Sequence, residues 1–184
     1  MKRLILGALS IFFLFILCAW AVLPSAHSRD SIVISVNCKW IGKMGQKTIA
    51  VGAAKPVLKN IQTGQRYKVE YKKKPYTFFY SIPKGVYVIE EIVLDAGQAK
   101  AKMKTSDLTN SFEIDKPGIY YLGGVDIIDY QTRFEYKVHD NSTHQADMNE
   151  IREILATKLK LPVPINIDLI EGVFIKERWE RQNI

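Results

Sequence analysis

The feature that most constrains the fold is a series of short segments in which apolar and polar residues alternate. From Tyr67 to Lys72, tyrosine and valine alternate with lysine and glutamate, which is the pattern of a strand with one buried and one wet face. Turn-forming residues such as Pro-Lys-Gly at 83–85 and Asp-Lys-Pro-Gly at 115–118 separate these segments. About eight or nine short strands of this kind predict two stacked antiparallel sheets.

The period of the apolar residues changes after His139. From there they recur at helical spacing, which predicts one amphipathic helix over about residues 143–160 that packs on the sheet through Met148, Ile151 and Leu155. Ser142 and Gln145 are placed to form its capping box. Strands and helix together predict an antiparallel β-sandwich with one C-terminal helix, in a single domain over residues 29–184. The charged tail after residue 175 is expected to fray.

The first 28 residues have the layout of a secretory signal. Two positive residues, Lys2 and Arg3, precede an uncharged apolar run at 4–23, and small residues follow it. The small residues near Ser28 predict cleavage between Ser28 and Arg29. A leader of this kind places the remaining chain in the periplasm or cell envelope.

Two other fates of the leader stay open. Its apolar run of 20 residues is long enough to cross a bilayer core, so it is also suited to stay as an uncleaved membrane anchor with the domain outside. Cys18 is a candidate lipidation site, although Leu17 stands where bacterial lipoprotein signals prefer a small residue. Both alternatives predict membrane association through the N-terminus.

Positive charge is concentrated in the first half of the exported chain. Residues 36–105 contain 14 basic and 4 acidic residues, whereas the rest of the chain beyond residue 28 contains 10 basic and 15 acidic ones. Such an excess attracts anionic lipids, acidic polymers or an acidic envelope protein, and its predicted centre is Lys68, Lys72, Lys73 and Lys74. Alternatively, the lysines keep exposed strands soluble and protect sheet edges. Nucleic acid is not an expected partner, because an exported protein rarely meets it.

Two motifs resemble a known kind of exported domain. The first is Ser-Ile-Pro-Lys-Gly-Val-Tyr-Val at 81–88, and the second is Phe-Glu-Ile-Asp-Lys-Pro-Gly-Ile-Tyr-Tyr-Leu-Gly at 112–123. Within residues 31–139, this pair resembles exported bacterial β-sandwich domains of the transthyretin-like or carboxypeptidase-regulatory type, and uncharacterised envelope lipoprotein domains. The resemblance implies an immunoglobulin- or transthyretin-like sandwich without catalytic residues.

A metal site is a further candidate, at the junction between the last alternating strand and the helix. His139, His144 and Asp147 are residue types that bind zinc, and His144 and Asp147 lie three positions apart on the predicted helix. A metal-dependent hydrolase would bring His139 and His144 together in one pocket. The alternative is that these are ordinary residues at the start of a helix. The second reading is favoured, and neither a metal nor a cofactor is expected.

Other functional signals in the sequence are weak. Gly123-Gly124 lacks the spacing of a nucleotide-binding loop and predicts a bulge or a close backbone approach. The aromatic residues from Tyr67 to Tyr87 either fill the core or form the platform of a carbohydrate- or peptidoglycan-binding module. Cys38 is expected to be a small buried hydrophobe. The expected function is therefore a non-catalytic exported envelope protein that serves as a binding or assembly module.

Overall fold

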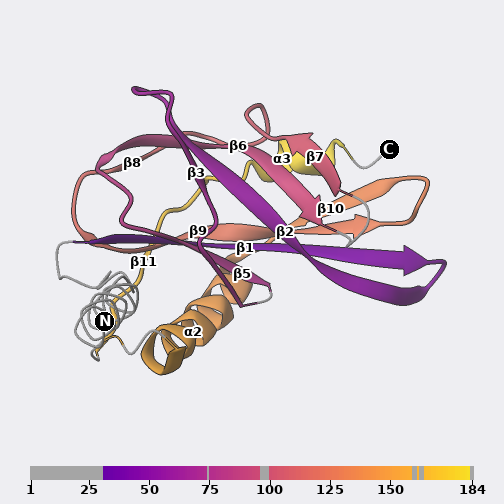
Figure 1. Cartoon of the computed structure of the whole chain (residues 1–184). Helices are drawn as coiled ribbons and strands as arrows, with labels where there is room; N and C mark the ends of the chain where they lie inside the picture. The colour runs from indigo at the N-terminus through magenta and orange to yellow at the C-terminus, as the bar shows by residue number, and fades with distance from the viewer. Residues whose placement is uncertain (1–30, 74, 96–99, 159–160, 162–163, 183–184) are drawn as a thin grey trace, which may run out of the picture.

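The computed structural model describes residues 31–73, 75–95, 100–158, 161 and 164–182 (Figure 1). The leader at 1–28, with the predicted cleavage after Ser28 and the candidate lipidation residue Cys18, lies outside the described residues, as does Lys74. None of the described helices combines the length and the apolar character that crossing a bilayer requires.

The described chain is mainly β, with two sheets of seven and five strands that are mostly antiparallel, and a helix near the C-terminus. The strands are β1 (Ile32–Met44), β2 (Lys47–Asn60), β3 (Arg66–Lys68), β4 (Tyr71–Lys73), β5 (Tyr76–Tyr80), β6 (Gly85–Asp95), β7 (Lys100–Lys104), β8 (Phe112–Ile114), β9 (Gly118–Asp129), β10 (Phe134–Val138) and β11 (Asp168–Leu169). The helices are α2 (Asn141–Lys158) and α3 (Lys176–Glu180). The predicted mainly β architecture and its late helix are confirmed.

The two sheets are connected through β2. Its first half pairs with β1 up to Ala53, and its second half pairs with β6 from Ala53 onward. The five-stranded sheet is completed by β3, β7 and β8, and the seven-stranded sheet by β4, β5, β9, β10 and β11. Two pairs depart from the predicted antiparallel arrangement, because β9 runs parallel to both β1 and β11.

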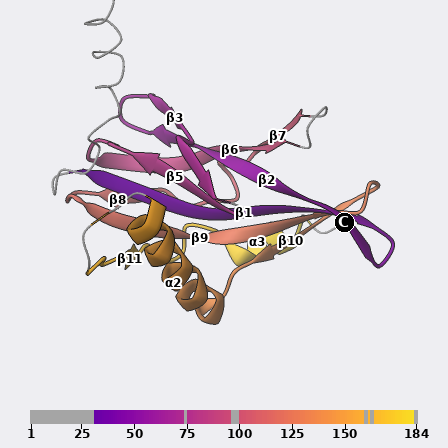
Figure 2. The same ribbon diagram turned by 60° about the horizontal axis from the view of Figure 1, so that its bottom comes forward.

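Two apolar clusters hold three layers together (Figure 2). The alternation of β1 explains this, since Ile34 and Val36 face the five-stranded sheet whereas Val33 faces α2. Between the sheets lie the side chains of Ile34, Val36, Cys38, Leu58, Tyr87, Ile89, Ile92, Leu122 and Ile127. Against α2 lie those of Val33, Tyr76, Phe78, Tyr121, Met148, Ile151 and Leu155. The predicted apolar stripe of the helix therefore packs on the sheet as expected.

Cys38 lies within the core between the sheets, which confirms its prediction as a buried hydrophobe. Burial, together with the negative charge of Asp126, raises the pKa of its thiol far above the ordinary value. A thiol in this state carries no nucleophilic thiolate, so Cys38 serves packing alone.

β1 continues to Met44, although Gly42 and Gly45 predict a loop from Lys39 to Gln46. The side chain of Trp40 explains the extension, because it lies across Gly52 of the paired strand. A Cβ atom at Gly52 would come within 2.4 Å of the Trp40 ring, so the indole fills the space that glycine leaves. We call residues 39–53 the β1–β2 arm; Figures 1 and 2 show it as a hairpin that extends to the same side of the molecule as the β9–β10 hairpin.

The C-terminal tail is ordered by one side chain, so the prediction that it frays is wrong. Residues 176–180 form α3, and Trp179 is fully buried in the cluster between the sheets. Its ring meets Tyr136 edge to face at 5.2 Å and also packs on Phe174. In the sequence, Trp179 is surrounded by charged residues, so nothing in the local pattern indicates that it is buried.

Candidate functional site

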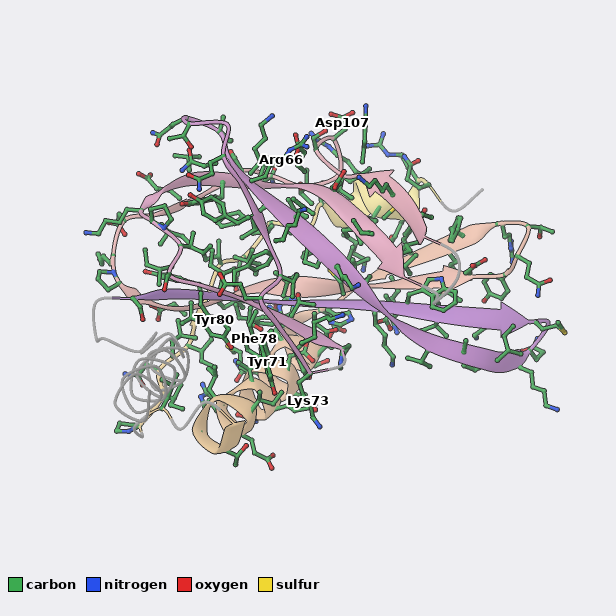
Figure 3. The ribbon with its side chains drawn as sticks, viewed as in Figure 1. Arg66, Tyr71, Lys73, Phe78, Tyr80 and Asp107 are labelled. Atoms are coloured by element: carbon green, nitrogen blue, oxygen red, sulfur yellow. The ribbon has the colours of Figure 1, made fainter. Side chains whose placement is uncertain are left out.

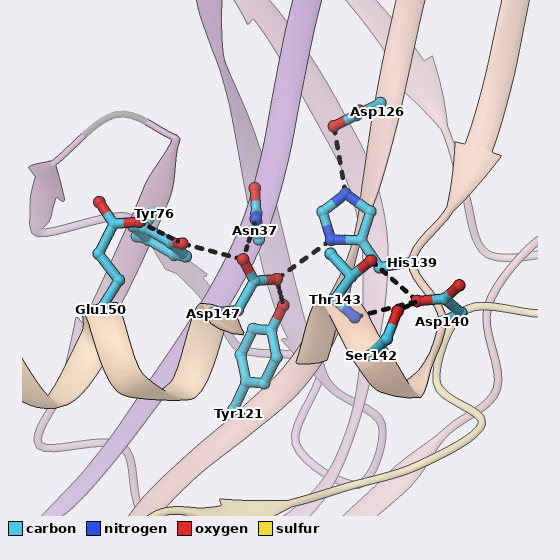
Figure 4. A network of polar contacts seen from close by, with 10 residues as sticks. All are labelled: Asn37, Tyr76, Tyr121, Asp126, His139, Asp140, Ser142, Thr143, Asp147 and Glu150. Carbon is cyan, nitrogen blue, oxygen red and sulfur yellow. Dashed lines mark hydrogen bonds and ion pairs between the residues drawn. The ribbon is translucent and has the colours of Figure 1, made fainter. Parts of the chain in front are cut away.

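The most concentrated group of buried polar side chains joins α2 to the seven-stranded sheet (Figure 4). At its centre is Asp147, which projects from the first half of α2 toward the sheet. Three strands supply partners: β1 carries Asn37, β5 carries Tyr76, and β9 carries Tyr121. His139 follows β10 directly. We call this group, together with Asp126 of β9, the Asp147 network.

Each oxygen of the Asp147 carboxylate has two polar partners. One oxygen accepts hydrogen bonds from Asn37 Nδ2 at 3.0 Å and from the Tyr76 hydroxyl at 2.9 Å. The other oxygen accepts from the Tyr121 hydroxyl and lies 3.1 Å from Nδ1 of His139. Burial alone would raise the pKa of Asp147, but these four bonds outweigh it and lower the pKa below the ordinary value. The carboxylate therefore stays charged inside the protein.

His139 lies between two carboxylates. Its Nδ1 faces Asp147 at 3.1 Å, and its Nε2 faces Asp126 Oδ1 at 3.2 Å. Because an ionised carboxylate only accepts hydrogen bonds, both ring nitrogens carry a proton and the ring is an imidazolium. Burial would lower the pKa of His139, but the bonds and charges of Asp126 and Asp147 raise it to about 9.

Glycines at the bend of β9 make room for this network, which confirms the predicted bulge and close approach. The pairing of β9 with β1 shifts register between Ser35 and Asn37, where Gly123 and Gly124 lie opposite. A Cβ atom at Gly124 would come within 2.4 Å of the Asn37 backbone oxygen and 2.8 Å of His139 Nδ1. Only a glycine therefore lets β1 and the imidazolium approach β9 so closely.

A cavity of about 220 Å³ lies beside the network. Both His139 and His144 line it, together with Gly123, Phe174 and Glu171. The His144 ring meets Tyr121 edge to face at 5.8 Å, and its Nδ1 has no hydrogen-bond partner among the described residues. Burial and the positive charge of His139 lower the pKa of His144, so this ring is neutral at pH 7.

The geometry of this site argues against metal binding by His139. Its two ring nitrogens are both engaged by carboxylates, so neither offers a lone pair to a metal ion. Within the described part of the chain, no group of three or more histidine, cysteine, aspartate or glutamate side chains has the arrangement of a metal site. The structure thus brings His139, His144 and Asp147 together, but as an ion-pair network beside a cavity.

Asp140 caps α2, so the predicted capping box is wrong. Its carboxylate accepts hydrogen bonds from the backbone N–H of Thr143 at 3.0 Å and from the hydroxyls of Ser142 and Thr143. These bonds hold the pKa of Asp140 well below its ordinary value. The cap fixes where the helix begins and thereby the position of Asp147 relative to the sheet.

The predicted lysine centre is divided between the two sheets. Lys68 lies on β3 and pairs with Val57 of the five-stranded sheet. Lys72 and Lys73 lie on β4, which pairs with β5 of the other sheet, and Figure 3 shows Lys73 close to α2 and far from Arg66 of β3. The single centre predicted from these neighbouring residues is therefore wrong, because the chain changes sheet between β3 and β4.

Lys68 instead joins a broader basic surface on the outer side of the five-stranded sheet. Two shallow cavities of about 320 and 290 Å³ cover this side, and both reach Glu91. The charged residues that line them are Lys55, Lys59, Arg66, Lys68, Lys102 and Lys104, with Glu90 and Glu91 as the acidic members. We call this set the basic face; its formal charge is +4.

Ion pairs on the basic face leave a surplus of positive charge. Glu90 binds Arg66 at 2.6 Å and Lys59 at 3.1 Å, and hydrogen bonding to Arg66 lowers the pKa of Glu90. Glu91 lies 3.9 Å from Lys102, whose side chain is largely exposed. Two carboxylates thus meet six basic side chains, and the surface keeps a net positive potential.

Comparison with family models, curated proteins and solved structures found no match for this chain.

Four members of the network were not predicted from the sequence: Asn37, Tyr76, Tyr121 and Asp126. A signal was present for two of them, because Asn37 and Asp126 are polar residues inside the two most apolar strands. A buried polar residue requires a partner, so such an interruption indicates a network. The two tyrosines gave no such signal, since a core tyrosine fits either strand face.

The network predicts that the protein loses stability as the pH rises above 6.5. The pKa of His139 is about 9 in the folded chain, against an ordinary value of 6.5. Its stabilising contribution is therefore complete below pH 6.5 and is lost as the pH rises through 9. The loss is on the order of 3 kcal/mol in the free energy of unfolding.

Urea unfolding at intervals across this pH window measures the effect, with His139→Gln as the comparison. Glutamine cannot titrate, so we expect the variant to be less stable at low pH and to lose much of the pH dependence. Two other groups affect stability at lower pH, because their pKa values are lowered in the folded chain. The stabilising contribution of Asp147 is lost as the pH falls below its ordinary pKa of 3.8, and that of neutral His144 is lost as the pH falls below 6.5. A wild-type profile that stays flat up to pH 9, or the same slope in His139→Gln, contradicts the assignment.

Proposed function

We propose that the chain is a non-catalytic exported protein of the cell envelope that binds an anionic component through its basic face. In this proposal the two sheets form a β-sandwich of the immunoglobulin or transthyretin type, and the leader at 1–28 directs export. The binding partner is an anionic lipid, an acidic polymer or an acidic envelope protein, which share closely spaced negative charges. No nucleic acid and no cofactor enter this function.

The observation that carries the proposal is the charge of the basic face. Its lysines and its arginine lie on β3, β2 and β7, and β6 pairs with both β2 and β7, so they meet a partner as one surface. The strand pairs place Lys68, Val57, Glu91 and Lys104 in one row and Lys55, Val93 and Lys102 in the next. Valine between the lysines lets their stems lie flat, with the ammonium groups directed outward.

The Asp147 network supports a non-catalytic role. A general base needs a nitrogen or oxygen that is free to accept a proton, and His139 has neither ring nitrogen free. Asp147 is saturated by four hydrogen bonds. The aromatic residues from 76 to 80 and Tyr87 are buried, so they do not form the exposed platform that a carbohydrate-binding module needs. The group most suited to chemistry therefore serves the fold.

Metal-dependent hydrolysis is the second candidate function, because one observation favours it. His139 and His144 line the same cavity, as that hypothesis requires, and His144 Nδ1 has no partner among the described residues. Against it stands the double carboxylate pairing of His139.

Charge reversal on the basic face tests the proposed function. We expect the triple variant Lys68→Glu, Lys102→Glu and Lys104→Glu to lose about 100-fold in affinity for vesicles rich in anionic lipid, since each lysine near such a surface contributes about 1 kcal/mol. Wild-type binding should also weaken as salt rises from about 0.05 M to about 0.5 M. Flotation of the protein with vesicles measures both effects, and soluble polyglutamate as competitor distinguishes a lipid surface from an acidic polymer.

The matched control reverses three exposed lysines elsewhere, Lys84→Glu, Lys116→Glu and Lys137→Glu, with the same change in net charge. Equal losses in both triple variants would show that net charge, and not the basic face, determines binding. Binding to neither anionic vesicles nor polyglutamate at low salt would leave the acidic protein partner as the remaining form of the proposal, tested by salt-dependent co-purification.

A further inference from the structure

The β1–β2 arm presents an open sheet edge. Residues 47–53 of β2 pair with β1 on one side, and β2 pairs with β6 only from Ala53 onward. Within the described residues, no strand pairs with 47–52 on the side away from β1. This stretch therefore directs a row of backbone N–H and C=O groups outward, ready to pair with another strand.

Apolar side chains mark this edge as a contact surface. Met44 is 60% exposed, Ile49 54% and Val51 47%. They are three of the five exposed large hydrophobic residues in the described chain, and all three belong to the arm. The register of β2 against β1 skips Ile49, so this side chain sits on a bulge. Edges that proteins protect from pairing carry several charged side chains, whereas this stretch has one, Lys47, and offers isoleucine and valine beside it.

The charge of the arm selects among possible occupants. Residues 39–52 contain three lysines, Lys39, Lys43 and Lys47, and no acidic residue. Among the neighbouring acidic residues, Asp126 and Asp129 lie on β9, which is on the other side of β1 from the open edge, and Asp95 of β6 pairs with Ala53, where the open stretch ends. A second copy of this chain would bring lysine against lysine, whereas a segment with acidic residues would neutralise them.

The arm is held in place before any partner arrives. Trp40 packs across Gly42 and Gly52 on one face, and β1 continues its pairing with β9 as far as Gly42. Lys43 lies 5.7 Å above the Tyr130 ring, which anchors the hairpin to the β9–β10 connection. A preformed edge binds more tightly than a flexible one, because less conformational entropy is lost on association.

We propose that the β1–β2 arm binds an extended acidic segment of a partner protein, which adds to residues 47–52 of β2 as a further strand. Backbone hydrogen bonds supply the general affinity. Apolar residues of the segment cover Ile49 and Val51, and its acidic residues meet Lys43 and Lys47. This surface is separate from the basic face, and the proposal holds whether or not that face binds an anionic component.

A synthetic peptide tests the proposal directly. The probe is a labelled peptide of about eight residues in which valine alternates with glutamate, the length of one edge strand. Two control peptides carry lysine in place of glutamate, or proline at the central positions, since proline cannot donate to a sheet ladder. Fluorescence anisotropy with the full chain should give binding of the acidic peptide and at least about tenfold weaker binding of both controls.

Two matched variants locate the site. Ile49→Glu places a negative charge on the edge and removes an apolar contact, so it should weaken binding of the acidic peptide at least about tenfold. Ile61→Glu makes the same change at an equally exposed residue, 51%, outside the arm, and should leave binding unchanged. Thermal unfolding shows that each variant is folded. Equal binding of the proline peptide, equal loss in Ile61→Glu, or a dimer that dissociates in the edge variant and excludes the peptide would each overturn the proposal.

Discussion

Replacing Asp147 by alanine is expected to lower the free energy of unfolding by about 3 to 5 kcal/mol, because it removes one partner of a buried ion pair. The change leaves Asp126 as the one remaining carboxylate partner of the His139 imidazolium, and it leaves the Asn37 amide and the Tyr121 hydroxyl without their acceptor. An unpaired buried donor costs about 1 to 3 kcal/mol, so the losses accumulate in one place. Urea unfolding monitored by circular dichroism measures the effect.

The matched control for this prediction is Asp140→Ala, which makes the same substitution seven positions earlier at the helix cap. The cap is exposed, and its loss should cost only about 1 kcal/mol. Asp147→Asn should resemble Asp147→Ala in stability, because the amide carries no negative charge to hold the imidazolium and its NH2 group cannot accept the hydrogen bonds that one carboxylate oxygen receives. An Asp147→Ala variant no less stable than Asp140→Ala would show that the network contributes little to folding.

The second large effect is expected at Trp179, whose replacement by alanine should cost about 3 to 5 kcal/mol. Its side chain is fully buried, and it ties the last helix to the cluster between the sheets through Tyr136 and Phe174. The indole Nε1 has no hydrogen-bond partner among the described residues. Trp179→Phe therefore removes no hydrogen bond and should cost less than about half as much as alanine.

The adjacent exposed residue supplies the comparison for Trp179. Glu180→Ala removes only a surface ion pair with Lys176 at 3.8 Å and should change stability by less than about 0.5 kcal/mol. Limited proteolysis adds a second measurement, because Trp179→Ala should expose the chain after Ile175 to cleavage while Glu180→Ala should not. Similar stability in both variants would contradict the role of Trp179 as an anchor.

Local patterns were sufficient to predict most strands and the helix. The helical spacing of Met148 and Ile151 depends on neighbours within a few residues, which is the range that periodicity reports. The alternation from Tyr67 to Lys72, predicted as one strand, is instead divided into β3 and β4, which belong to different sheets. Burial of Cys38 followed from the same local pattern. These features depend on which face of a strand or helix is apolar, and the spacing of apolar residues in the sequence shows that face directly.

Contacts between strands and helices that are distant in the sequence could not be predicted from local patterns. The partners of Asp147 come from residues up to 110 positions away, and no local pattern indicates that Asn37 and Asp147 are adjacent. Lys68 and Lys72 are close in sequence, yet they belong to different sheets because the chain crosses between them. Trp179 was missed because one apolar residue among charged ones has no period to detect.

The parallel pairing of β1 with β9 has a consequence for how the chain reaches its native state. The ladder joins Ile32 to Gly118 and continues to Gly42 with Asp129, so its closure must wait for a loop of nearly half the chain. Closing so long a loop costs entropy that local contacts do not repay, and chains dominated by such pairings fold slowly. Until β9 pairs with it, β1 exposes an unpaired edge of the larger sheet. Refolding at high protein concentration should therefore favour association between chains at this edge over pairing of β1 with β9.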